Sequence, residues 1–307
     1  MNRATFNKFI VPGLFSAAEQ NYKQKSKEAI YKKFVKVRTD SKRAYEESAY
    51  QSGLGLPVVK PEGKEITYDD AVPGPTKRWN HTTYGLGMRV TEEAVEDILY
   101  TEVPNDMASI SKELTGSFVE LWEVLCHDII NSGTVTTSHT AGDGLAIFSG
   151  SHLALRGGTW SNLLSPTADL SATSLQTAID NFTTTKSDSN RYQIIKPKFL
   201  LVHPNNAWKA HELLDSGYDP ESANNSVNSI KNWGLSVIVS PFLTDTDAFT
   251  LIADAPNEDG GVIAFMRRDV TVKQDSDFET GDYKFKATAR FSVEVNKPNN
   301  LYYSAGA

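Results

Sequence analysis

The stretch NDMASISKELTGSFVELWEVLCHDIIN, residues 105–131, carries apolar side chains at steps of three and four. This spacing places them on one face of a helix, so it predicts an amphipathic helix over about 105–131. Pro104 stands in the first turn, where proline is tolerated, and Ser132-Gly133 supply the stop signal. At a rise of 1.5 Å per residue the helix is about 40 Å long, far beyond the mean globular helix. We therefore expect an equally long element beside it.

The stretch YKFKATARFSVEV, residues 283–295, alternates apolar and polar side chains without a break. Strict alternation is typical of a strand with one buried face. At about 3.3 Å per residue this strand extends about 43 Å, which matches the predicted helix. Thr280-Gly281-Asp282 predicts a turn before it, and Val270 and Val272 fit the antiparallel partner strand. The sequence thus predicts an elongated layer, one long helix on one long hairpin.

Composition limits the class of protein. The chain has 307 residues of which 39% are hydrophobic, enough for one large or two modest cores. The longest apolar runs, such as Phe199–Val202, are far shorter than the ~20 residues of a membrane span. No secretory signal pattern is visible. The single Cys126 excludes an internal disulfide framework and a cysteine-based zinc cluster.

Charge is distributed unevenly along the chain. The net charge is −7, yet residues 1–45 hold eleven Lys and Arg against three Asp and Glu. A basic segment on an acidic body can bind nucleic acid, or it can bind the acidic body of an identical neighbour. It can also be a solvated amphipathic helix, because Phe34, Val35 and Val37 give it an apolar side to bury. The sequence leaves these three interpretations open.

The segments before the long helix lack a core of their own. Residues 19–50 carry only a weak helical stripe, so we expect them to need a partner surface. Residues 51–84 are interrupted by glycine and proline and are typical of a long hairpin or loop, which at this length usually has a function. Thr91, followed by two glutamates, predicts a short helix that ends near Tyr100.

Residues 153–257 predict a separate α/β domain. Ser171 is the expected N-cap of a helix whose buried face holds Leu175, Ile179 and Phe182. Three short apolar runs predict buried strands, and a further helix is expected between the first and the second. These are Phe199–Val202, Asn206–Leu214 for the helix, Leu235–Val239 and Phe249–Ala253.

Signatures of catalysis are weak. Ser149 and Ser151 next to His152 suggest a nucleophile and a base, but no G-x-S-x-G elbow follows a strand. Gly53-x-Gly55 and Gly85-x-Gly87 lack the third glycine of a dinucleotide-binding motif. The six histidines show no H-E-x-x-H spacing, so the sequence does not indicate a metal site. We therefore predict no catalytic, cofactor-binding or metal-binding residues. The run Lys77-Arg78-Trp79 could stack on bases, although packing or a subunit contact is the favoured interpretation.

The order of these elements, together with a series of short motifs, resembles the major capsid proteins of tailed phages with the Hong-Kong-97-type fold. Within that class the likeness points to the Mu-like prophage head-subunit group, and it covers nearly the whole chain. The motifs are Gly63-Lys64-Glu65-Ile66-Thr67-Tyr68-Asp69, Gly85-Leu86-Gly87, Val90-Thr91-Glu92-Glu93, Asp143-Gly144-Leu145 with Phe148, Ser151-His152, Ser161-Asn162-Leu163, Leu175-Gln176-Thr177-Ala178, Pro197-Lys198-Phe199-Leu200-Leu201-Val202, Trp233-Gly234-Leu235, Ser240-Pro241-Phe242-Leu243-Thr244-Asp245 and Thr288-Ala289-Arg290-Phe291.

This resemblance implies an α+β fold divided into five parts. They are an N-terminal arm over 1–50, an extended E-loop over 51–90, a peripheral domain over 91–152 and 262–297 around a spine helix at about 105–131, an axial domain over 153–261, and a C-terminal tail over 298–307. An arm and a loop that cannot bury themselves are expected to lie on neighbouring subunits. The residues expected to make such contacts are Lys42, Arg43, Lys60, Glu62, Lys64, Lys77, Arg78 and Trp79.

The resemblance also implies the function and the partners. A capsid subunit would assemble with itself into pentamers and hexamers of an icosahedral or prolate shell around double-stranded DNA, held by sequence-independent contacts. Portal and scaffold proteins, and optionally a decoration protein, would complete a virion that is assembled in the bacterial cytoplasm, with no membrane and no cofactor involved. Two alternatives stay open: an encapsulin-like compartment that holds an enzyme, and a soluble serine hydrolase that uses Ser149 or Ser151 with His152.

Overall fold

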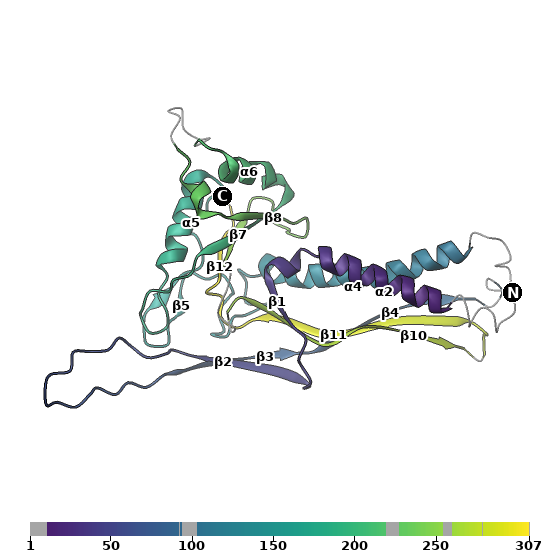
Figure 1. Ribbon diagram of the computed structural model, residues 1–307, viewed down its shortest axis with the longest axis horizontal. Helices are drawn as coiled ribbons and strands as arrows, with labels where there is room; N and C mark the ends of the chain where they lie inside the picture. The colour runs from purple at the N-terminus through teal and green to yellow at the C-terminus, as the bar shows by residue number, and fades with distance from the viewer. Residues whose placement is uncertain are drawn as a thin grey trace.

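The chain has an extended shape in which three parts can be told apart (Figure 1). A long layer of helices on a sheet lies at one side, a smaller α/β unit lies at the other, and a narrow hairpin projects beneath both. The computed structural model describes residues 11–91, 93, 103–218, 227–253, 260–277 and 279–306.

The long layer has one four-stranded sheet in the order β1-β10-β11-β4. β10 pairs antiparallel with β11, β11 pairs antiparallel with β4, and β1 runs parallel to β10. Helices α2 and α4 cover one face of this sheet (Figure 1), and together they are called the helical layer below. The bounds are α2 Val11–Glu28, β1 Val35–Arg38, β4 Thr82–Val90, α4 Val103–Asn131, β10 Val262–Ser276 and β11 Tyr283–Val295.

Aromatic packing joins α4 to the long hairpin. Trp122 of α4 stacks on Phe291 of β11 with ring centroids 3.8 Å apart, and Tyr31 stacks on the same indole at 5.5 Å. Every second residue of β11 from Tyr283 to Phe291 is buried, as the alternation predicts. The predicted strand at 283–295 is confirmed, and the predicted helix is confirmed with two more residues at its start.

The segment after α2 folds onto its own chain. Tyr31, Phe34 and Val35 are buried in the same core as α4, and the Glu123 carboxylate accepts hydrogen bonds from the backbone N–H groups of Ile30 (2.5 Å) and Tyr31 (3.0 Å). A short turn of helix, η2 (Tyr31–Lys33), leads into β1. The expectation that this segment needs a neighbour's surface is therefore wrong for residues 11–38. The sparse apolar residues of the segment suffice because they fill one site beside α4.

The predicted E-loop divides into two structures. β2 (Tyr45–Gln51) and β3 (Pro73–Asn80) form an antiparallel hairpin whose connection, residues 52–72, is called the hairpin loop below. Residues 82–90 instead form β4 at the edge of the long sheet. The hairpin loop itself contains no strand. The prediction of an E-loop over 51–90 is therefore wrong for residues 82–90. These residues form a strand because β11, far along the sequence, provides their hydrogen bonds.

The α/β unit contains a second four-stranded sheet in the order β12-β9-β7-β8. Ser171 caps α5 with a capping box, and the predicted helix face of Leu175, Ile179 and Phe182 is buried. The C-terminal segment is not a tail: β12 is fully buried and pairs with β9. The elements are β5 His152–Leu153, β6 Thr159–Trp160, α5 Ala172–Thr184, β7 Pro197–Val202, η4 Pro204–Asn206, α6 Ala207–Asp215, η5 Ile230–Trp233, β8 Ser236–Val239, β9 Phe249–Ala253 and β12 Leu301–Ser304.

Some of the predicted segments lie outside the residues that the structure describes. The predicted helix from Thr91 to Tyr100 lies almost wholly outside the described residues, as do residues 1–10 of the predicted arm. Among the residues described, no helix combines the length and apolar character needed to cross a membrane. Within the same ranges, no group of three or more His, Cys, Asp or Glu side chains could hold a metal ion.

Candidate functional site

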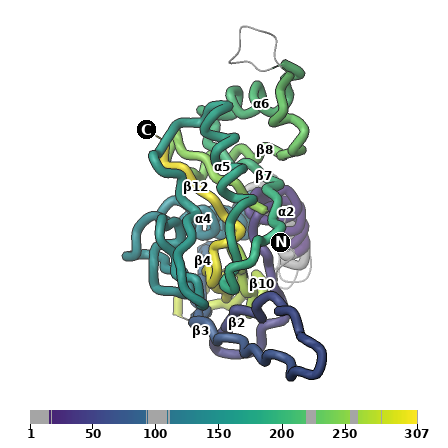
Figure 2. The backbone as a smooth tube through the Cα atoms, turned by 90° about the vertical axis from the view of Figure 1, so that its left-hand side faces the viewer, coloured from purple at the N-terminus to yellow at the C-terminus, as the bar shows by residue number. Residues whose placement is uncertain are grey.

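The hairpin loop exposes an unusual number of large apolar side chains. Val59 is 92% exposed, Tyr68 84% and Leu56 75%, and Val58 and Ile66 are more than half exposed. The loop extends away from the rest of the chain (Figure 1), and Figure 2 shows it at the bottom of the molecule beyond β2 and β3. Several large apolar side chains left exposed on one loop are typical of an interaction site.

Arg156 holds the start and the end of the hairpin loop together. Its guanidinium pairs with Asp69 at 2.9 Å and donates to the carbonyl oxygens of Gly53 (3.1 Å) and Asp70 (2.5 Å), while its Nε donates to the Ser52 hydroxyl (3.1 Å). The hydrogen bond from Arg156 lowers the pKa of Asp69. Because Arg156 lies in the turn between β5 and β6, this cluster attaches the loop to the α/β unit.

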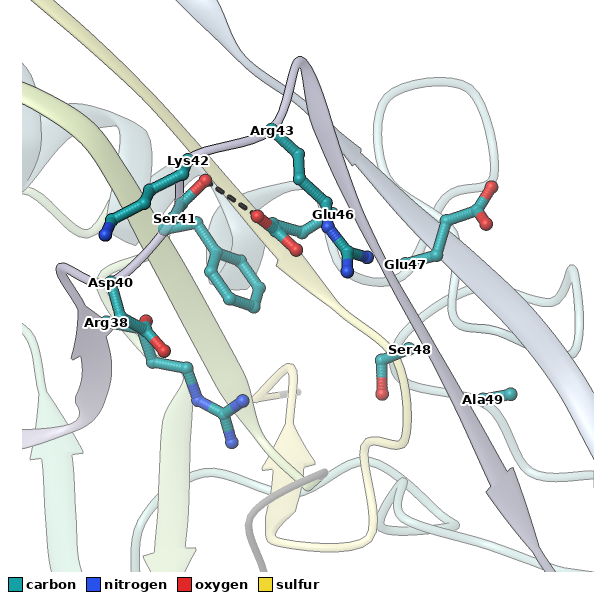
Figure 3. A pocket seen from close by; sticks show the side chains of 10 residues that line it. Arg38, Asp40, Ser41, Lys42, Arg43, Glu46, Glu47, Ser48 and Ala49 are labelled. Carbon is teal, nitrogen blue, oxygen red and sulfur yellow. Dashed lines mark hydrogen bonds between the residues drawn. The ribbon is translucent and has the colours of Figure 1, made fainter.

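The base of the hairpin encloses a polar cavity of about 490 Å³ (Figure 3). Charged side chains of both signs surround it, and Ser41 donates a hydrogen bond to Glu46 at 2.9 Å across it. The predicted contact residues Lys42 and Arg43 line this cavity and have exposed side chains. The lining residues are Arg38, Asp40, Ser41, Lys42, Arg43, Glu46, Glu47, Ser48, Ala49 and Phe265.

His81 connects the hairpin to the long sheet. It lies between β3 and β4, with Nε2 2.9 Å from the Ser41 hydroxyl and Nδ1 3.0 Å from the Ser292 hydroxyl. Burial, followed by the nearby Arg290 charge, lowers the pKa of His81. A neutral imidazole can donate to one hydroxyl and accept from the other, so His81 links the connection between β1 and β2 to β11.

The predicted contact residues fall into three groups. Lys60, Glu62 and Lys64 lie on the hairpin loop with exposed side chains, as Lys42 and Arg43 do at its base. Lys77 and Arg78 are paired within the chain. Lys77 donates to the Thr140 carbonyl at 2.7 Å and lies 3.2 Å from Glu294, and Arg78 pairs with Glu47 at 2.5 Å.

Trp79 is the exception. Its side chain has no exposed surface, its indole N–H donates to the Ile263 carbonyl at 3.3 Å, and it packs edge-on against Phe265. Of the two favoured interpretations of Trp79, packing is confirmed, and a subunit contact does not fit this burial. The indole fills the space between the hairpin and the long sheet and so fixes the hairpin to its own chain.

The geometry at His152 does not fit a serine hydrolase. Nδ1 of His152 lies 2.7 Å from the Asp143 carboxylate, as in a catalytic triad, but Nε2 faces the carbonyl oxygen of Ile147 at 3.2 Å. The imidazole is fully buried and stacked on Trp160. Although burial acts to raise the pKa of Asp143, the hydrogen bond and charge of His152 lower it overall. The pair therefore braces the loop before β5.

Sequence reasoning missed Arg156 and Glu123 as positioning residues. The Arg156–Asp69 pair spans 87 positions and the Glu123 bonds span more than 90. No local pattern indicates either contact. On the predicted long helix Glu123 falls on the side opposite the apolar stripe, so the sequence gives no signal that this carboxylate is buried.

Comparison with protein families matches residues 75–304 to the family described as phage capsid protein. Because the match covers most of the chain, the chain belongs to this family. Among curated proteins no sequence matches.

Solved structures give the same class of fold. The chain is similar to the capsid structure of the cyanophage P-SCSP1u, at 12% identity over 91% of this chain and 88% of that one, with a TM-score of 0.58. It is similar to the capsid of a native GTA particle, at 8% identity over 89% and 88%, with a TM-score of 0.56. It is also similar to a structure from Gordonia phage Cozz, at 12% identity over 91% and 86%, with a TM-score of 0.55.

These findings confirm the predicted fold class and the general function. The chain has the α+β Hong-Kong-97-type capsid fold. It is a major capsid protein, a structural component of a phage virion.

Proposed function

We propose that this chain is the major head subunit of a tailed phage of the Mu-like group, and that it assembles with itself into pentamers and hexamers of a closed shell around double-stranded DNA. The observation that carries the proposal is the hairpin loop, whose apolar side chains have no core in their own chain. Such a surface gains free energy only when another protein covers it. Repeated contacts of one copy on the next close into rings and shells.

The division into an N-terminal arm, an E-loop, peripheral and axial domains and a C-terminal segment belongs to the same proposal. Lys42, Arg43, Lys60, Glu62 and Lys64 would face a neighbouring subunit, since their side chains are exposed around the hairpin. Arg78 would keep Glu47 as its partner and shape the hairpin. Portal and scaffold proteins, a decoration protein and assembly in the bacterial cytoplasm complete the proposal as what the family resemblance implies.

We also infer that the chain has no catalytic role. The support is the position of His152, whose Nε2 faces a backbone carbonyl. A serine-reactive probe tests this inference. Labelling at Ser149 or Ser151 that depends on His152 would overturn it, and absence of labelling in folded protein is the expected result.

Electron microscopy of the purified chain tests the shell itself. Uniform hollow particles are expected, and a compact monomer at high concentration would contradict the proposal. Nuclease treatment of particles from infected or expressing cells then separates two kinds of container. A protected DNA genome is expected for a phage head, whereas a protected enzyme cargo without DNA would support the encapsulin-like alternative.

A paired substitution tests the role of the hairpin loop. Val58→Asp with Val59→Asp places two charges where the proposal requires burial, so we expect folded subunits and no shells. Val58→Ile with Val59→Ile keeps the apolar surface at the same positions and is expected to assemble normally. Circular dichroism verifies that both variants fold. Wild-type particle yield from the aspartate variant would show that these residues face solvent in the assembly.

A further inference from the structure

Two surfaces of the chain carry opposite charge. Residues 11–36, which form α2 and the start of β1, hold six lysines and two glutamates. Residues 45–72, which form β2 and the hairpin loop, hold six carboxylates and two lysines. The chain as a whole is acidic, so the basic segment is a local feature that the net charge of −7 conceals.

Four exposed lysines on α2 and η2 form what is called the lysine face below: Lys23, Lys27, Lys32 and Lys33. Lys23 pairs with Glu19 at 2.6 Å and Lys32 donates to the Ser26 hydroxyl at 2.6 Å. In the described parts of the chain, no carboxylate lies within ion-pair distance of Lys27 or Lys33. Since the Ser26 hydroxyl is neutral, three of the four lysines have no carboxylate partner among the described residues.

The lysine face is held on a rigid support. The Thr115 hydroxyl donates to the carbonyl oxygen of Ala18 at 3.0 Å, and the Asn21 side chain donates to the carbonyl of Lys112 at 2.7 Å. Lys25 lies across Gly116 of α4, so close that a side chain at that position would meet its ammonium group. Lys23 and Lys27 thus project from a helix that is fixed to α4, and the Glu123 hydrogen bonds fix η2, which carries Lys32 and Lys33, to the same helix.

The position of the lysine face decides between two anionic partners. The helical layer lies on one side of the long sheet, and the acidic hairpin lies on the other side (Figure 1), an arrangement that the perpendicular view also shows (Figure 2). In a shell one subunit thick, a neighbour's hairpin lies on the same side as the chain's own hairpin. The neighbour's hairpin would have to pass through the shell to reach the lysine face. The polyanion on the other side of such a wall is the packaged nucleic acid.

We propose that the helical layer faces the lumen and that Lys23, Lys27, Lys32 and Lys33 contact the phosphate backbone of the packaged double-stranded DNA. The inference rests on the proposed function, since it needs a DNA-filled shell. Lysines on long flexible stems suit contacts that follow the charge of DNA and read no sequence. Each phosphate contact releases counterions, so the affinity depends on salt in proportion to the number of lysines engaged.

Salt-dependent binding measures the number of contacts. Capsomers that have not closed into shells are titrated with a duplex of random sequence over a range of NaCl concentrations. Lys27→Gln, Lys32→Gln and Lys33→Gln together should flatten the slope of log K against log[salt] by about 0.9 per lysine. The matched control removes the same charge from the other side of the sheet, with Arg268→Gln, Lys273→Gln and Lys286→Gln, and should leave the slope unchanged. Equal slopes in the two variants would overturn the proposal. If the triple variant does not fold, Lys32→Gln alone should change the slope by about 0.9.

Chemical labelling of intact particles tests on which side the lysine face lies. An amine-reactive ester coupled to a dextran too large to enter the shell is applied to intact and to disrupted particles, and the labelled lysines are identified by mass spectrometry. Protection of Lys27 and Lys33 in intact shells, and labelling after disruption, is expected. Labelling in intact shells would overturn the inference while the capsid function stands, whereas absence of particles would count against the function itself. If the triple variant loses shells and its capsomers keep the wild-type salt slope, the partner is a second copy and the DNA proposal is wrong.

Discussion

Replacement of Glu123 should loosen the N-terminal segment from the rest of the subunit. The carboxylate is buried and accepts two backbone hydrogen bonds, from Ile30 and Tyr31. A hydrogen bond to a charged group contributes about 1.5–3 kcal/mol, so two of them contribute about 3–6 kcal/mol. Burial raises the pKa of Glu123 although both hydrogen bonds act to lower it, so desolvation outweighs these bonds for the ionised carboxylate, and the loss on substitution comes from the two N–H groups left unpaired. We therefore expect Glu123→Ala to lower the free energy of unfolding by about 3 kcal/mol, and Glu123→Gln, which keeps one acceptor, by about half as much.

Two measurements on unassembled subunits check this magnitude. Urea denaturation gives the loss of stability, and amide hydrogen exchange shows where it acts. A loss near 1.4 kcal/mol corresponds to about tenfold faster exchange, which should be confined to the amides around Ile30 and Tyr31. Glu120→Gln on the exposed side of the same helix is the matched control and should change neither quantity. If Glu123→Gln behaves like this control, or destabilises the subunit without faster exchange at these amides, the carboxylate does not anchor the segment.

Three other substitutions follow from the contacts described. Arg156→Ala should make the hairpin loop several-fold more sensitive to limited proteolysis, because the loop loses its tie to the α/β unit; an unchanged cleavage rate would contradict this. His139 lies beside the carboxylates of Glu294 and Asp128, which raise its pKa above 6.5. The stability from these pairs is complete below pH 6.5 and lost as pH rises through the folded-state pKa, so His139→Gln should flatten the pH dependence of urea unfolding in that range. Lys286→Glu should stabilise the subunit by about 0.2–1 kcal/mol, because Lys286 lies directly opposite Lys273 in the sheet; lower stability would show that another group already neutralises the pair.

Elements whose own residues set their pattern could be predicted from the sequence. The strand at 283–295 has the predicted bounds, because thirteen alternating side chains specify one face and one register. The helix after Ser171 is equally local, since its cap and its apolar face lie within one short segment. For these elements no distant partner has to be known.

Elements that depend on distant partners could not be predicted. The resemblance places residues 82–90 in the E-loop, whereas they form β4, which is paired with β11 far along the sequence. Trp79 follows two basic residues and resembles an exposed contact residue, yet the sheet buries it completely. The segment 11–38 shows too few apolar residues to fold alone, and it folds because α4 offers Glu123 and Trp122 as partners.

The two sides of the long sheet explain why one chain can tile a shell and still have an inside and an outside. Trp79 and His81 attach the hairpin to one face of the sheet, and Trp122 and Glu123 attach α2 and η2 to the other. These attachments are buried and lie on opposite faces of the sheet, so the hairpin and the helical layer are anchored at separate places. In the proposed shell, a subunit built in this way would adapt its contacts to pentamers and hexamers on one face, while the other face would keep its charge toward the contents.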